Sequence, residues 1–235
     1  MVNQMTRVYE KLKLGIKQIE EGLGINQLDD EEIFNNIEKY QITAKAYVLL
    51  VHAELEKYFE ILSVMIAKDS FFEFDIHKNP TLPLLSLAST NLYVIKGYKN
   101  KDSDIDFKTR VKGFFTRYIA LVKENNGIKA KNVSELFWML GLSKDAIGDD
   151  LLSLLDSYGI KRGAIAHTGK LGNEQLLNIK EEEKSVRQLI NEIEKFDLCI
   201  EKSGYITGKE NIDEIEAIIF SYQGTSNEDE CDLQN

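Results

Sequence analysis

The chain has 235 residues, of which 43% are hydrophobic and 29% charged, and its formal net charge is −10. That apolar content is enough for a buried core, whereas the negative charge disfavours an extended nucleic-acid surface, because phosphates are bound by cationic side chains. No apolar run approaches the roughly 18–20 residues that span a bilayer, and the first twenty residues lack a signal-peptide pattern. Cys199 and Cys231 stand alone, without the spacing of a metal site or a disulfide framework. We therefore expect a cytoplasmic protein with no membrane anchor, metal or cofactor.

The charge is uneven along the chain. Between Lys96 and Lys131, ten Lys and Arg side chains stand against four acidic ones. Such a stretch is either an ordinary solvated helix face or a local surface for an anionic ligand. The sequence alone leaves both interpretations open.

The first half of the chain is predicted to be mainly helical, since prolines are rare and Leu, Ile, Glu and Lys are common. A first amphipathic helix is predicted over about 4–22, ended by the glycines of "EGLGIN". A long helix is predicted over about 29–67. Its apolar residues recur in steps of three, four and seven, as on a buried helix face: Val48, Leu55, Phe59, Leu62 and Ile66. Residues 68–108 carry both prolines, and we expect an insertion or a helix–loop segment there between core helices.

Helical periodicity returns in the second half. We expect a helix over 107–125, and then a short helix in "NVSELFWMLGLS" capped by Asn132 or Ser134. In that segment Phe137 and Trp138 are expected in the core, with contact to RNA bases as the alternative. A helix over 144–157 is expected to end at Gly159.

Two further segments complete the predicted domain. A long amphipathic helix is predicted over 173–202, and "NIDEIEAIIFSY" at 211–222 is either a short helix or a strand. Residues 223–235 have the composition of a disordered acidic tail. We therefore predict a single all-α domain over residues 1–222, built as a bundle of long antiparallel helices.

One short stretch, "KRGAIAHTG" at 161–169, combines a fixed cation with a titratable imidazole. On an ideal helix, residues five positions apart are separated by roughly 140–150°, so Arg162 and His167 do not share a face. Arg162 is nevertheless long enough to swing toward His167. The small residues between them leave room for another helix, a second subunit or a ligand. The alternative is a helix that carries both residues without a chemical role.

These two groups suit the cleavage of RNA without a metal ion. A histidine can take a proton from the ribose 2′-hydroxyl or give one to the departing 5′-oxygen. An arginine can hold the phosphate and stabilise the charge of the transition state. Because one histidine cannot easily be both acid and base, two copies facing each other across a two-fold axis would supply both. We therefore expect a homodimer.

The same stretch resembles the Arg-x4–6-His motif of the HEPN superfamily. The segment "AKAYVLLVHAELEKYFEIL" at 44–62 is similar to the long earlier helix of its RiboL-PSP-HEPN-type members. The resemblance covers roughly residues 30–200 and implies an HEPN-like helical bundle. It further implies a metal-independent endoribonuclease of a microbial defence or toxin–antitoxin system. RNA would be the substrate, an antitoxin or another defence protein a further partner, and Arg162 and His167 the catalytic pair at a dimer interface.

Two positions depart from the pattern of the superfamily. Gly163 follows the arginine, where active members often carry a polar residue, and Gly169 stands where some members carry a tyrosine. The resemblance therefore leaves an alternative, a catalytically inactive HEPN module that binds a partner protein, a nucleotide or RNA. The overall acidity of the chain also favours that alternative.

Further residues are expected to support the pair. His52 and Glu56 are four positions apart on the long helix and so share one side of it. In one interpretation His52 lies at the edge of the core with a hydrogen-bond partner. In the other, Glu56 faces Arg162 or His167 across the bundle and orients them or tunes the imidazole pKa. The resemblance also favours Glu56, because HEPN domains tend to have a polar residue on this helix near the motif.

The immediate neighbours of the pair complete the predicted site. Lys161 and Lys170 flank the motif and are expected to help hold a phosphate. Gly163 and Thr168 directly follow the arginine and the histidine, and we count them as supporting residues.

Overall fold

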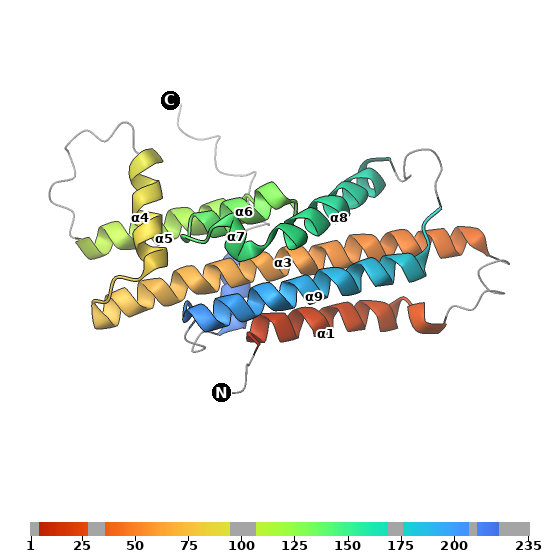
Figure 1. Cartoon of the computed structure of the whole chain (residues 1–235), viewed down its shortest axis with the longest axis horizontal. Coiled ribbons are helices and arrows are strands. Elements are labelled where there is room, and N and C mark those ends of the chain that lie inside the picture. Colours follow the sequence, from red (N-terminus) through yellow and green to blue (C-terminus); the bar gives the residue numbers. More distant parts are fainter. Residues whose placement is uncertain (1–4, 28–35, 95–106, 169–175, 207–210, 221–235) are drawn as a thin grey trace, which may run out of the picture.

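The computed structural model describes residues 5–27, 36–94, 107–168, 176–206 and 211–220. Every regular element in these ranges is a helix, as the predicted all-α fold requires. The central element is α3 (Ile37–His77), which runs through the whole molecule (Figure 1). At about 1.5 Å per residue, a helix of 41 residues is roughly 60 Å long. None of the described helices is apolar and long enough to cross a membrane.

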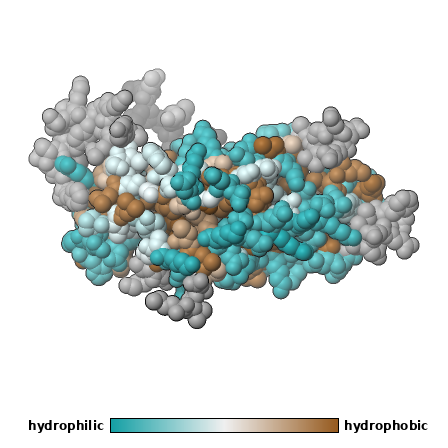
Figure 2. Space-filling view, viewed as in Figure 1, coloured by the Kyte–Doolittle hydropathy of each residue, from teal (hydrophilic) through white to brown (hydrophobic). Residues whose placement is uncertain are grey.

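The remaining elements pack around α3. In chain order they are α1 (Arg7–Gly22), the 3-10 turn η1 (Ile25–Gln27), α4 (Leu82–Val94), α5 (Phe107–Lys123), α6 (Ala130–Trp138), α7 (Lys144–Ile147), α8 (Asp149–Thr168), α9 (Ile179–Ser203) and α10 (Ile212–Phe220). Helices α1 and α9 lie along one side of α3, and α5 to α8 lie along the other (Figure 1). Figure 2 shows hydrophilic side chains over the outward face of α9, as expected for an amphipathic helix.

The core is built around the middle of α3. Every side chain from Tyr58 to Ala67 is buried, because α1, α5, α9 and α10 enclose this part of the helix. The five apolar positions predicted for its buried face are all buried, which confirms that part of the pattern. One buried carboxylate ties three helices together. Asp197 of α9 accepts hydrogen bonds from the Thr6 backbone N–H (2.8 Å), the Thr6 hydroxyl (2.6 Å) and the Tyr58 hydroxyl (2.9 Å).

The long helix starts and ends later than predicted. It begins after Asn36, whose side chain caps it by accepting from the Lys39 N–H at 3.3 Å. It continues to His77 and ends where Lys78 adopts a left-handed conformation with φ 57°. After a short break, residues 82–94 form another helix, α4, so the described part of 68–108 agrees with the helix–loop alternative. Residues 95–106 lie outside the described ranges.

The short helix α6 differs from its prediction in two respects. Neither Asn132 nor Ser134 caps it, since both lie inside the helix. Instead, the carboxylate of Asp156 on α8 accepts a hydrogen bond from the Ala130 N–H at 2.7 Å. The first N–H of α6 is thus capped by a residue that is distant in the sequence. Phe137 is fully buried as expected, but Trp138 is 62% exposed, so its assignment to the core is wrong.

The helix that carries the motif does not break at Gly159. α8 runs without interruption from Asp149 to Thr168, so the predicted end at residue 157 is wrong. The glycine serves packing instead, because a Cβ built there would lie 2.9 Å from Cγ of Lys129, just before α6. Near the C-terminus, 212–220 form the helix α10 rather than a strand. The predicted acidic tail, 223–235, lies outside the described residues.

Candidate functional site

Both motif residues lie on one continuous helix, α8. Five residues correspond to about 7.5 Å along a helix axis and about 140° around it. Arg162 is half-buried and its charge acts on two residues of α3, whereas His167 is exposed in the last turn. The arginine therefore faces the bundle and the histidine faces outward.

His52 is a buried, neutral partner in this arrangement. Its side chain is 3% exposed, and burial, aided by the charge of Arg162, lowers its pKa to about 4. Its Nδ1 lies 3.8 Å from a carboxylate oxygen of Glu56, one helical turn away. At neutral pH this contact is not an ion pair, because the imidazole is uncharged.

Glu56 lies between the arginine and the loop that joins α5 to α6. Burial raises the pKa of its carboxyl group, and two neighbours oppose this effect: the backbone N–H of Gly127, which donates to it, and the charge of Arg162. Glu56 is thus within electrostatic reach of Arg162, as one of the two sequence interpretations requires. Its catalytic role stays a prediction.

The α5–α6 loop adds polar residues that sequence reasoning missed. The amide of Asn125 donates to Oε1 of Glu60 at 2.9 Å, and its carbonyl oxygen accepts from Asn132 at 3.4 Å. Gly127 has φ 114°, a conformation that side chains rarely adopt, and it turns its N–H toward Glu56. A sequence signal was present, since Glu60 follows Glu56 by one helical turn and "NNG" is typical of a turn.

Burial also affects Glu60 itself. Glu60 is only 6% exposed, and this burial raises the pKa of its carboxyl group to about 7. The nearby charge of Glu56 also raises this pKa, whereas the hydrogen bond from Asn125 lowers it. A carboxyl group with such a pKa exchanges its proton near neutral pH.

The lysines expected to hold a phosphate have different positions. Nζ of Lys161 lies 2.8 Å and 2.7 Å from the two carboxylate oxygens of Glu182, a residue of α9 that is 5% exposed. This ammonium group is therefore occupied in joining α8 to α9. Lys170 lies outside the described residues, and the side chain of Thr168, at the end of α8, is also not described.

The outward face of α8 is small and apolar. A Cβ built on Gly163 would meet no atom within 4 Å, so the surface there is open. One turn earlier, Ile160 is 62% exposed, and Ala166 is exposed as well. This face leaves space for a second chain or a ligand beside the motif.

The basic stretch noted in the sequence falls partly on α5. Lys108, Arg110, Lys112 and Arg117 are all exposed on that helix, and Lys108 pairs with Asp75 at 2.6 Å. In the described part of the stretch, these residues form a solvated helix face. Residues 96–106 of the stretch are not described.

The site offers a cation, an imidazole, the buried carboxyl group of Glu60 and the partly buried one of Glu56. Within the described ranges, no group of three or more His, Cys, Asp or Glu residues is placed to hold a metal ion. An imidazole such as that of His167 can transfer a proton, and a guanidinium such as that of Arg162 can stabilise negative charge. That these residues and Glu56 act in this way stays a prediction.

Comparisons with known proteins agree with this architecture. A family model described as RiboL-PSP-HEPN matches residues 16–202, from α1 to the end of α9. The match includes α3, the α5–α6 loop and all of α8. No significant match to a curated protein or to a solved structure was found.

Proposed function

The chain belongs to the RiboL-PSP-HEPN family, and on that premise we propose that it is a metal-independent endoribonuclease in which Arg162 and His167 cleave RNA. The position of Arg162 carries the proposal. Arg162 is half-buried, its charge acts on Glu56, and it forms no ion pair with a carboxylate of the described residues. A guanidinium can hold a phosphate through two parallel hydrogen bonds, which suits this residue to the role.

In the proposed reaction, His167 removes the proton of the ribose 2′-hydroxyl. The 2′-oxygen attacks the adjacent phosphorus, and the bond to the 5′-oxygen breaks. A second, protonated histidine gives its proton to that leaving oxygen, so the products are a 2′,3′-cyclic phosphate and a free 5′-hydroxyl. Arg162 donates hydrogen bonds to the phosphate oxygens, where negative charge increases in the transition state.

The second histidine would come from another copy of the chain. The open surface at Gly163 and the exposed Ile160 support this part of the proposal, because two α8 helices can approach closely over small and apolar residues. A symmetric dimer places one His167 from each copy near a shared phosphate. Each active unit then needs two intact histidines.

The test is RNA cleavage by the full chain in the presence of a chelator. Mixed RNA should be cut by the wild type, and both Arg162→Ala and His167→Ala should lose at least a hundredfold in rate. His77→Ala, which changes an exposed histidine at the far end of α3, is the matched control and should cleave normally. Cleavage that survives both motif substitutions would refute the assignment.

Mixing wild-type and His167→Ala chains tests whether the active unit is a dimer. When His167→Ala protein is added in excess and allowed to exchange subunits, activity per wild-type chain should fall with the wild-type fraction. If each chain acts alone, that activity stays constant.

A catalytically inactive, ligand-binding HEPN module is the second candidate. The net charge of −10 favours it, since it weakens binding to long RNA. Absence of cleavage by the wild type, together with binding of RNA, a nucleotide or a protein, would support this candidate.

We further propose that the protein is cytoplasmic and acts in a microbial defence or toxin–antitoxin module. Growth arrest on expression, relieved by His167→Ala, would agree with such a role.

A further inference from the structure

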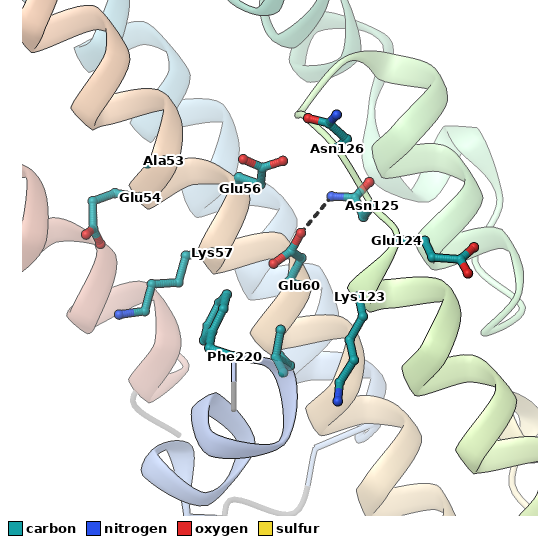
Figure 3. A pocket seen from close by; sticks show the side chains of 11 residues that line it. Ala53, Glu54, Glu56, Lys57, Glu60, Lys123, Glu124, Asn125, Asn126 and Phe220 are labelled. Carbon is teal, nitrogen blue, oxygen red and sulfur yellow. Dashed lines mark hydrogen bonds between the residues drawn. The ribbon is translucent and has the colours of Figure 1, made fainter. Parts of the chain in front are cut away.

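A cavity of about 650 Å³ lies beside the candidate site, between the middle of α3, the end of α5 and α10 (Figure 3). Its size is within the range of about 300–1,000 Å³ that is typical of small-ligand pockets. Glu56 lines this cavity and is also within electrostatic reach of Arg162. Glu56 therefore connects the cavity to the arginine that we place on the phosphate.

One side of the cavity carries a carboxyl group that is held in place. Glu60 is 6% exposed, and Figure 3 shows its carboxyl group pointing toward the α5–α6 loop, where Asn125 donates to Oε1 at 2.9 Å. Asn125 is itself fixed, since it also donates to the carbonyl oxygen of Gly127 at 3.3 Å and accepts from Asn132. Among the described residues no hydrogen bond reaches the other oxygen, Oε2 of Glu60. Glu60 thus presents acceptor capacity that the described residues do not use.

The rest of the lining indicates what kind of ligand fits. The ring of Phe220 borders the cavity and is 37% exposed, so a flat group can stack on it. Four Glu residues and two Lys residues line the space, and one of the lysines, Lys57, pairs with Glu216 at 3.3 Å. This negative excess disfavours a phosphate and favours a flat ligand that donates hydrogen bonds.

We propose that the cavity is a base-recognition subsite that binds a guanine of the RNA, with Glu60 accepting hydrogen bonds from its Watson–Crick edge and Phe220 stacking on its ring. Guanine presents two adjacent donors on that edge, N1–H and the N2 amino group, which match the two oxygens of one carboxylate. Adenine, cytosine and uracil each present one donor there next to acceptors, which a carboxylate repels. This inference rests on the proposed function, because it assigns the base specificity of that nuclease.

The experiment measures binding separately from cleavage. Short 2′-O-methyl oligonucleotides lack the attacking hydroxyl, so fluorescence anisotropy with the full chain at pH 8 reports binding alone. An oligonucleotide with one central guanine should bind about tenfold more tightly than the same sequence with adenine, as expected for one well-formed bidentate contact. Equal affinity for the two oligonucleotides would overturn the proposal.

Substitutions in the protein locate the contact. Glu60→Gln should remove the guanine preference, and Phe220→Ala should weaken both oligonucleotides equally. Glu54→Gln is the matched control, since Glu54 lines the same cavity but its carboxylate lies against Gly15 of α1. A preference that persists in Glu60→Gln, or that is lost in Glu54→Gln, would refute the role of Glu60.

Substitutions in the RNA repeat the test without altering the protein. Inosine, which lacks the N2 amino group, should bind several-fold more weakly than guanine, whereas 7-deazaguanine, whose Watson–Crick edge is intact, should bind like guanine. The opposite order would overturn the proposal.

The two proposals fail in distinguishable ways. Cleavage that depends on His167 but shows no guanine preference would refute the guanine subsite alone. Guanine preference without cleavage would refute the nuclease activity alone.

Discussion

Arg162 on α8 and Glu56 on α3 are electrostatic partners across the bundle, although they are 106 positions apart in the sequence. The positive charge of Arg162 lowers the pKa of the Glu56 carboxyl group, against a larger opposite effect of burial. The same charge disfavours protonation of His52, one turn before Glu56. The charge of Arg162 thus acts on the long helix, whereas His167 is exposed.

Glu56→Gln should slow cleavage without unfolding the protein. Glutamine can still accept from the Gly127 N–H, but it lacks the negative charge that Glu56 presents to Arg162. Because the proposed mechanism places Arg162 on the transition state, kcat should fall about tenfold while KM and the free energy of unfolding change little. Steady-state kinetics with urea unfolding would measure this, and Glu54→Gln serves as the control. An unchanged kcat would show that Glu56 does not position the arginine.

Lys161→Met should affect stability rather than RNA binding. The substitution leaves the carboxylate of Glu182 buried without its partner, which costs about 3–5 kcal/mol in typical buried pairs. The double variant Lys161→Met/Glu182→Met should recover most of that loss, since no unpaired charge remains. Urea unfolding checks both variants. If the double variant is stable but binds RNA much more weakly than the wild type, Lys161 does contact the phosphate as the sequence suggested.

The two glycines inside α8 should respond differently to alanine. At Gly163 a Cβ meets nothing, so Gly163→Ala should stabilise the protein by about 0.5–1 kcal/mol through the better helix propensity of alanine. At Gly159 the added Cβ lies 2.9 Å from the Lys129 side chain, and the variant should gain less or lose stability. Thermal unfolding of both variants compares them directly. Equal stabilisation at the two positions would contradict the close packing of Gly159.

Glu60 should make stability fall as the pH rises toward neutrality. Its pKa is about 7 in the folded chain and near 4.5 when it is exposed, so the folded state holds a proton that the unfolded state releases. The stabilising contribution of the neutral group is complete below about pH 4.5 and is lost as the pH rises to about 7. His52 has a pKa of about 4 in the folded chain, so its contribution makes stability rise, rather than fall, as the pH increases from 4 to 6.5.

The contribution of Glu60 is isolated by a comparison with Glu60→Gln. Because both proteins contain His52, its effect cancels in the difference between them. The unfolding free energy of the wild type minus that of the variant should decrease between pH 5 and pH 7, by up to about 1.4 kcal/mol per pH unit. Urea titrations at several pH values measure this difference. A difference that is constant over that range would mean that Glu60 titrates normally.

The sequence was most informative where the periodic pattern was long. The buried face of α3 was predicted correctly, because a helix enclosed on one side needs apolar residues at helical spacing whatever surrounds it. The ends of helices were less well predicted. The sequence placed a cap at Asn132 or Ser134 and a break at Gly159, but both features depend on α6 and α8 packing against each other, through Asp156 and Lys129.

The candidate site divides in the same way. The sequence by itself determined an all-α fold and, through the resemblance, the family, because these depend on local spacing and on a short pattern of residue types. The catalytic role of Arg162 and His167 stays a prediction. Only the tertiary structure decided that the charge of Arg162 acts on Glu56 and that Lys161 forms an ion pair with Glu182. It also decided that Glu60 lines a cavity and accepts a hydrogen bond from Asn125 of the α5–α6 loop. The physical reason is that charge interactions and burial depend on distances between helices, and no local pattern fixes how distant helices pack.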